Sequence, residues 1–302
     1  MIQDSNSTTR PGGRSPYQGL NAEPNQLPNI LSASPQAPIY QDSTHQLYYL
    51  QTEQGDKVLK TLNPDAPQQA FWRNVRDLFG LDLNQHLHHQ AWCSDQLAGL
   101  TDLAIPQIEQ AVNPTEGLQG FVLAVKLAGE TGQANWMNQT NIERFAEHLS
   151  ALHQVQYSKW GVWNQPQYRL HEWPIKLAQS LKNWMSPTGH QAWWSVIKQA
   201  EAIQMSYAVP TMLDLRWDQF LFEQQQLSAL VDLDAFVLAP VELTWVILEY
   251  LLDDHQAWWL AQAYGEVPDL TQVREVYRLW LFRLNLLGET DLTRWMSAPT
   301  RF

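Results

Sequence analysis

The chain has 302 residues, and its ionisable side chains sum to a formal net charge of −12. This acidity argues against nucleic acid as a partner, because nucleic-acid recognition needs a basic patch. It would suit a cationic ligand, but acidity also keeps proteins soluble, and we favour solubility as its main role. Hydrophobic residues make up 44% of the chain, enough for one large or two small domains with a real core.

Three features bear on where the protein works. The only cysteine is Cys93, so no internal disulfide can form and a reducing compartment is indicated. Residues 1–11 lack the charged start and apolar run of a signal peptide. The most apolar window, residues 235–252, contains Pro240, Glu242 and Glu249 and predicts a buried helix, not a membrane span. We therefore expect a cytoplasmic protein.

The first 132 residues predict a tail followed by a small α+β lobe. Residues 1–38 are rich in Pro, Asn, Ser, Gln and Gly, which is typical of a disordered tail. Residues 39–62 predict three strands, with a hairpin turn at Gln54-Gly55-Asp56. Helical spacing follows over 67–80 and 83–100, and two more strands are expected at 105–109 and 120–125. We expect this lobe to span residues 39–132.

Lys60 lies near the middle of the third of these strands, between apolar residues. Its long side chain can either reach out to solvent or point into a cleft, and the sequence alone favours solvent.

Residues 133–302 predict a larger lobe that is mostly helical. Helical periods run from residue 140 and over 174–185, 190–205, 241–253, 255–263 and 271–287. A pair of strands, 220–222 and 227–231, interrupts this helical region.

Two side-chain clusters are ambiguous. The helix at 83–100 carries His86, His88, His89 and Cys93, but the cysteine pairs of a structural zinc site are missing, so a partly exposed amphipathic helix is favoured. The chain has 15 tryptophans, most of which we expect in helix interfaces. Trp258-Trp259 beside Asp253-Asp254 could bind a cation, although a packed helix junction is favoured.

The stretch from residue 212 to 249 concentrates the chemistry. Asp214 and Gln219 precede the strand pair, and Asp232 and Asp234 follow it. Acids and an amide at the ends of paired strands face one another at short range and can share a divalent cation, which prefers oxygen ligands.

Three segments resemble the aminoglycoside phosphotransferase and choline kinase family, the small-molecule branch of the kinase-like fold. They are FAEHLSALHQV at 145–155, MLDLRWDQFLF at 212–222 and LVDLDAFVLAPVELTWVIL at 230–248. The segment at 212–222 is similar to the family's HGDxHxxNxL catalytic loop, and the segment at 230–248 to its metal-binding segment. The spacings of five residues from Asp214 to Gln219 and thirteen from Gln219 to Asp232 also match.

The resemblance implies a divergent member with a bilobal α+β fold and an ATP- or GTP-dependent activity on the hydroxyl of a small molecule. Asp214 would orient or deprotonate that hydroxyl, and Lys60 would hold the donor's inner phosphates. Gln219, Asp232 and Asp234 would bind Mg²⁺. An amine-bearing or choline-like cationic acceptor is allowed by the net charge but not demanded.

This sequence departs from the family pattern at four places. Met212-Leu213 replaces His-Gly before the catalytic Asp, and Gln219 replaces Asn. No Gly-rich loop occurs between residues 39 and 50, and the helix expected to supply an acid to Lys60 offers only Asp95.

Two alternatives to an enzyme therefore stay open. One is an inactive pseudokinase that acts as a binding or scaffold protein. The other is an unrelated helical interaction module, in which Asp232 and Asp234 only cap helices or solvate a turn.

Overall fold

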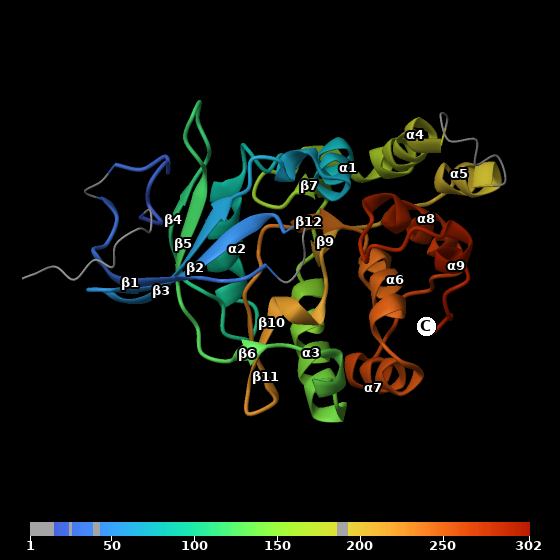
Figure 1. Cartoon of the computed structure of the whole chain (residues 1–302). Helices are drawn as coiled ribbons and strands as arrows, with labels where there is room; N and C mark the ends of the chain where they lie inside the picture. Colours follow the sequence, from blue (N-terminus) through green and yellow to red (C-terminus); the bar gives the residue numbers. More distant parts are fainter. Residues whose placement is uncertain (1–14, 24–25, 39–42, 186–192) are drawn as a thin grey trace, which may run out of the picture.

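A computed structural model describes residues 15–23, 26–38, 43–185 and 193–302. Figure 1 shows a sheet-rich part on one side of the molecule and a helical part on the other. This is the bilobal α+β architecture that the resemblance implied.

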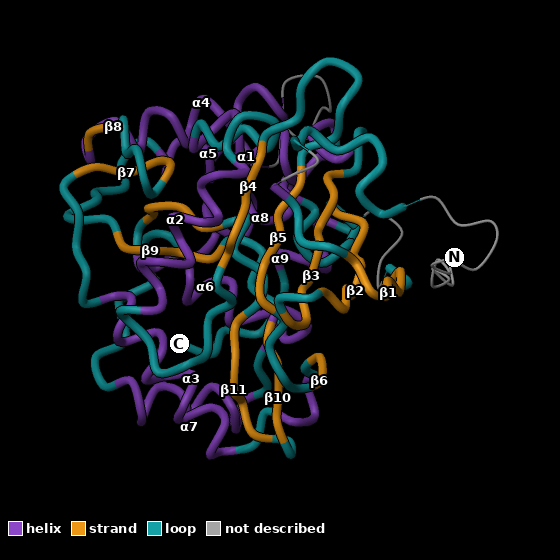
Figure 2. The backbone as a smooth tube through the Cα atoms, turned by 90° about the vertical axis from the view of Figure 1, so that its left-hand side faces the viewer, coloured by secondary structure: helices purple, strands orange, loops and turns teal. Residues whose placement is uncertain are grey.

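The first part is built on a five-stranded antiparallel sheet with the order β1-β2-β3-β5-β4. Figure 2 looks toward this sheet, with the β10–β11 hairpin at its lower end. Its strands are β1 (Ile30–Pro35), β2 (His45–Thr52), β3 (Gly55–Leu62), β4 (Ile108–Val112) and β5 (Phe121–Val125). Two helices lie between β3 and β4, α1 (Ala70–Phe79) and α2 (Leu87–Ala98), and α2 packs along β4.

The N-terminal segment corrects one expectation. Residues 30–35 do not belong to a disordered tail, because they form β1 and pair with β2. Leu20 is also buried, against Leu59 and Phe121 on the outer face of the sheet. The apolar residues of this segment follow neither a helical nor a strand period, so the composition hid their role. The strand expected at residues 39–41 lies outside the described residues.

The helical part carries two small sheets, with the orders β11-β10-β6 and β8-β7-β12-β9. Their strands are β6 (Glu130–Thr131), β7 (Lys159–Val162), β8 (Tyr168–Arg169), β9 (Val209–Met212), β10 (Phe220–Glu223), β11 (Gln226–Leu230) and β12 (Phe236–Ala239). The helices are α3 (Gln139–His153), α4 (Trp173–Met185), α5 (Trp194–Ala200), α6 (Val241–Leu251), α7 (Asp254–Tyr264), α8 (Arg274–Leu284) and α9 (Leu292–Met296). No described helix has the length and apolarity that a membrane crossing requires.

Aromatic packing joins the two parts of the molecule. Phe79 at the end of α1 meets Trp160, Trp173 and Trp280, with ring centroids 5.6–5.8 Å apart. All four side chains are fully buried. The expectation that most tryptophans fill helix interfaces holds for these residues.

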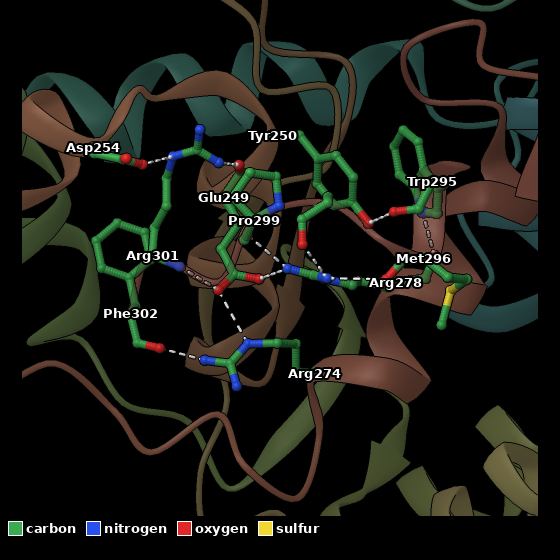
Figure 3. A network of polar contacts seen from close by, with 11 residues as sticks. Glu249, Tyr250, Asp254, Arg274, Arg278, Trp295, Met296, Pro299, Arg301 and Phe302 are labelled. Carbon is green, nitrogen blue, oxygen red and sulfur yellow. Dashed lines mark hydrogen bonds and ion pairs between the residues drawn. The ribbon is translucent and has the colours of Figure 1, made fainter. Parts of the chain in front are cut away.

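Glu249 on α6 is buried among arginines (Figure 3). Its carboxylate accepts hydrogen bonds from Arg278 at 2.6 Å, Arg274 at 3.0 Å and the backbone N–H of Arg301 at 3.1 Å. Arg278 also donates to the backbone carbonyls of Met296, Ala298 and Pro299. The network therefore fixes residues 296–301 against α6 and α8.

Glu249→Gln should destabilise the protein by about 3–5 kcal/mol, because breaking a buried ion pair leaves uncompensated charge. Urea unfolding measures this change. Asp254→Asn is the matched control: its carboxylate also pairs with Arg301, at 3.3 Å, but is 88% exposed, and we expect a change within about 0.5 kcal/mol. Equal effects of the two variants would contradict this account.

Buried histidines should make the fold acid-sensitive. On α3, His148 contacts the Thr101 hydroxyl at 2.8 Å and His153 contacts the Tyr264 hydroxyl at 2.9 Å. Burial lowers the pKa of His148 to about 4 and, with help from neighbouring His148, that of His153 to about 3. The unfolded chain, with a pKa near 6.5, binds these protons more readily, so their contribution is complete above pH 6.5 and is lost as the pH falls toward 4.

We expect the free energy of unfolding to fall by about 1–2 kcal/mol per histidine between pH 7 and pH 5. Urea titrations at both pH values test this. His148→Asn should reduce the pH dependence, whereas the exposed His88→Asn on α2 should leave it unchanged. A His148→Asn protein with the parent's full pH dependence would rule out His148 as a source.

Candidate active site

A cavity of 850 Å³ lies where the five-stranded sheet meets the loops of the helical part. Its lining includes Lys60, Asp214, Gln219 and Asp232, four of the five candidate site residues, which come from distant parts of the chain. The fifth candidate, Asp234, lies behind Asp232 and is only 6% exposed.

Lys60 enters this cavity, so the expectation that it points to solvent is wrong. Its ammonium group donates to the Asp232 carboxylate at 2.9 Å and to the Val231 carbonyl at 3.2 Å. The side chains of Lys60 and Asp232 are 16% and 21% exposed. Burial opposes the charge on Lys60, but the nearby carboxylates of Asp232 and Asp234 outweigh it and raise the pKa of Lys60. The strand pattern favoured solvent because it carries no information about Asp232, the partner of Lys60 across the cavity.

Asp232 and Asp234 lie in the loop between β11 and β12 and cap no helix. Burial favours the protonated form of Asp232, but the charge of Lys60 prevails and lowers its pKa. For Asp234, burial and the adjacent Asp232 charge raise the pKa well above its usual range. The two carboxyl groups share a hydrogen bond, and His45 lies 3.5 Å from Asp234. The environment therefore pushes the pKa values of the two carboxyl groups in opposite directions.

Asp214 follows β9, directly after the buried Met212 and Leu213. Its carboxylate lies 3.2 Å from Arg216, which also contacts the Asp218 carboxylate at 3.3 Å. Arg216 and Asp218 stand in the same loop, and sequence reasoning gave them no role. The sequence does contain a signal for them: the cation Arg216 lies two residues after the expected catalytic acid, Asp214.

Gln219 lies between the Asp214–Arg216 pair and Asp232. The amide orientation that satisfies its neighbours puts its nitrogen 2.9 Å from Asp232 and its oxygen 2.7 Å from Arg216. The longer side chain therefore spans from Arg216 to the Asp232 carboxylate. For the amide oxygen of Gln219 to face a cation at Asp232, the amide group would have to rotate so that its oxygen and nitrogen exchange places.

The structure also shows what stands in place of the two family features that are missing near Lys60. Asp95 on α2 is exposed, and Asp232 takes the place of the missing helix acid. The connection between β1 and β2 stands where the family pattern has a Gly-rich loop. Its described residues, 36–38 and 43–44, line the cavity.

The histidine cluster of α2 is split into two pairs: the rings of His86 and His88 stack with centroids 6.0 Å apart, and His89 contacts the Cys93 thiol at 3.3 Å. His89 is fully buried and contacts the Phe236 carbonyl at 2.9 Å, whereas His88 is exposed and His86 contacts the Asp82 backbone. Among the described residues, no three His, Cys, Asp or Glu side chains are arranged to hold a metal ion. A metal at Asp232 would thus need ligands from a bound substrate as well.

The acids near Trp258-Trp259, Asp253 and Asp254, both have partners at the start of α7. Asp253 caps α7 by accepting from the Gln256 N–H at 2.8 Å, and Asp254 pairs with Arg301. None of these four residues is among the described residues that line the cavity, and Trp258 is 60% exposed.

Comparison with known proteins gives a likeness in structure only. No protein-family model matches the chain, and no curated protein sequence does. Solved structures do match, with a putative fructosamine-3-kinase from Haemophilus somnus among them at a TM-score of 0.60 and 12% identity over 88% of this chain and 89% of that one. The chain has the kinase-like fold.

Two further structures with this kinase-like fold extend the comparison. A thermostable mutant of aminoglycoside phosphotransferase APH(4)-Ia, in complex with ADP and hygromycin B, has a TM-score of 0.59 at 11% identity, covering 88% of this chain and 91% of that one. The macrolide 2'-phosphotransferase MphH from Brachybacterium faecium has 0.55 at 13% identity, covering 91% and 96%. The resemblance found in the sequence is confirmed at the level of the fold, and an unrelated helical module is excluded.

The Lys60–Asp232 pair should couple the two parts of the molecule energetically. Lys60→Met and Asp232→Asn should each destabilise the protein, because each leaves a partly buried charge without its ion-pair partner. The double variant should cost less than the sum, with a coupling energy of about 1–3 kcal/mol in a double-mutant cycle. Urea unfolding of the four proteins gives this value, and additive effects would show that the pair does not link the two parts.

Proposed function

We propose that the protein is a nucleotide-dependent phosphotransferase that acts on a hydroxyl group of a small molecule. The observation that carries this proposal is the convergence of Lys60, Asp214 and Asp232 on one cavity. Phosphoryl transfer needs little covalent chemistry from the protein, and these are the charges that it needs most. The structural likeness to phosphotransferases that bind nucleotide adds support.

In this proposal the donor is ATP or GTP, and its base lies against the sheet. Val58, Ala124, Val125 and Leu127 offer an apolar lining there, and the Lys126 ammonium group lies 4.2 Å from the centroid of the Tyr49 ring beside them. Lys60 would then exchange part of its contact with Asp232 for the donor's inner phosphates. Lysine serves well in this role because it is a compact, mobile point charge.

Mg²⁺ fits Asp232 best. Magnesium in such sites is held by one or two carboxylates together with substrate phosphates and water, so a cluster of three protein acids is unnecessary. Asp232 faces the cavity and has a pKa lowered by Lys60, and Gln219 would join it after its amide exchanges the positions of oxygen and nitrogen. Asp234 would contribute less readily, because it is buried behind Asp232 and its pKa is raised. The ion would offset the charge of the phosphates and align them.

Asp214 would act on the acceptor. Its carboxylate would take the proton of the acceptor hydroxyl as that oxygen attacks the terminal phosphorus and the bond to the nucleoside diphosphate breaks. Arg216 holds Asp214 in place at 3.2 Å.

A second candidate is an inactive binding protein with the same fold. It is favoured by the interactions of Asp214 with Arg216 and of Gln219 with Asp232, which occupy the groups that catalysis would use. Such a protein would bind nucleotide or a small molecule without turnover.

Nucleotide binding separates these candidates from any other function. ATP or GTP with Mg²⁺ should raise the melting temperature, since ligand at a hundred times Kd stabilises by about 2.7 kcal/mol. Lys60→Ala should abolish this shift, and Lys159→Ala, an exposed lysine on β7, should preserve it. Absence of a shift at millimolar ATP and GTP would reject the phosphotransferase and would leave, of the second candidate, only a protein that binds a small molecule other than nucleotide.

Asp214→Asn then distinguishes enzyme from binding protein. It should keep the nucleotide-induced shift and lower turnover by about 10²–10⁴-fold, the usual contribution of a general base. Asp95→Asn, on the exposed face of α2, is the matched control and should match the parent. A parent protein that binds nucleotide but transfers phosphate to no alcohol would favour the inactive candidate.

A further inference from the structure

The loop between β9 and β10 alternates buried side chains with side chains that line the cavity. The buried ones are 0%, 2% and 5% exposed and are Leu213, Leu215 and Trp217. The residues between and after them are charged and line the cavity, namely Asp214, Arg216 and Asp218. The Trp217 ring packs against Phe145 with centroids 5.1 Å apart. The loop therefore presents Arg216 to the cavity while its other face is fixed in the core.

The Arg216 guanidinium lies at the centre of the polar contacts of this loop. Its Nε lies 3.3 Å from the Asp218 carboxylate, and its Nη2 lies 3.2 Å from the Asp214 carboxylate. The same Nη2 donates to the Gln219 amide oxygen at 2.7 Å, and the Gln219 amide nitrogen donates to Asp232 at 2.9 Å. These contacts place the guanidinium between the proposed proton acceptor, Asp214, and the proposed metal ligand, Asp232.

The lysine and arginine side chains that line the cavity, among its described residues, are Lys60, Lys126 and Arg216. Lys60 pairs with Asp232 and is the residue proposed for the inner phosphates of the donor. Lys126 lies over the Tyr49 ring, at the end of the cavity proposed for the base. Arg216 pairs with Asp214, at the end where the acceptor hydroxyl is expected.

Arg216 and Gln219 depart from the family pattern together. The catalytic-loop pattern HGDxHxxNxL has its second His at the place of Arg216 and its Asn at the place of Gln219. Gln219 is one methylene longer than Asn, and its amide spans from Arg216 to Asp232. The two departures therefore make one contact in the structure.

A phosphoryl group in transfer spreads negative charge over its three equatorial oxygens. A guanidinium presents its N–H donors in a planar fork that can bind two phosphate oxygens at once, and preorganised donors aimed at developing charge give large rate effects. The Arg216 side chain is 22% exposed, so a ligand in the cavity can reach it. Asp218 can hold its Nε while the terminal nitrogens exchange partners.

We infer that Arg216 is a catalytic residue that binds the phosphoryl group during its transfer. This inference rests on the proposed phosphotransferase function. In the ligand-free site the terminal nitrogens hold Asp214 and Gln219, and in the loaded site they turn to the phosphoryl oxygens. The acceptor oxygen bonds to phosphorus as the bond to the nucleoside diphosphate breaks, the hydroxyl proton passes to Asp214, and Arg216 keeps its protons. The same turn releases the Gln219 amide oxygen toward a cation at Asp232.

Aluminium fluoride beside a nucleoside diphosphate imitates the phosphoryl group in transfer, and it gives a test that needs no acceptor. The full-length protein is melted with Mg²⁺ and ADP or GDP, and again with aluminium fluoride added. In the parent, the fluoride should raise the melting temperature further, because it binds the folded state. Arg216→Ala should keep the shift due to the nucleoside diphosphate and lose the added shift. Arg294→Ala, whose side chain is 80% exposed on α9, is the matched control and should show both shifts.

Arg216→Gln removes the charge but keeps a polar side chain, and it carries the same test if Arg216→Ala does not fold. The full added shift in either folded variant overturns the inference, and so does a parent protein that shows no added shift.

Turnover separates contact with the phosphoryl group from a role through Asp214 alone. With an alcohol that the parent phosphorylates, Arg216→Ala should lower kcat by about 10²–10³-fold, the usual cost of removing one transition-state donor, and leave the KM for nucleotide unchanged. If Arg216 only kept Asp214 ionised, raising the pH would restore kcat in the variant. Such a recovery would make Arg216 a positioning residue and reject direct contact.

The outcomes also separate this inference from the proposed function. A parent protein that binds no nucleotide rejects the phosphotransferase proposal, and the inference falls with it. If the parent transfers phosphate and Arg216→Ala has the parent's kcat, the inference alone is rejected.

Discussion

Lys60 and Asp232 lie 172 residues apart and meet at 2.9 Å. One comes from the middle of a sheet strand and the other from a loop of the helical part, so their ion pair spans the cavity between the two. Charges that are only 16% and 21% exposed must be paired or neutralised, and here each satisfies the other. Asp234, His45 and Gln219 then arrange themselves around this pair. The geometry of the candidate site follows from how these charges are accommodated.

The sequence was informative where local pattern and three-dimensional structure agree. The alternation of β3 was predictable because one face of the strand is buried, and α6 was predictable because its long apolar run indicates a helix buried on most sides. The spacing from Asp214 to Asp232 also pointed to one site, since the short β10–β11 hairpin returns the chain to its starting edge.

Other features could not be predicted because they depend on distant partners. The direction of Lys60 is set by Asp232, and the burial of Leu20 is set by β3 and β5. The small strands β7, β8, β9 and β12 are too short to show a period. The cavity lining brings together Asn63 and Gly288, which no local pattern connects.

The anchoring of residues 296–301 bears on how the protein is made. Glu249 is synthesised 52 residues before Arg301, yet its carboxylate is satisfied only when Arg274, Arg278 and Arg301 have all arrived. During translation, Glu249 therefore has no arginine partner until the segments that carry Arg274, Arg278 and Arg301 have left the ribosome. The five-stranded sheet, which is complete by Val125, can form before that point. The packing of residues 296–301 against α6 and α8 is a late step of folding on the ribosome.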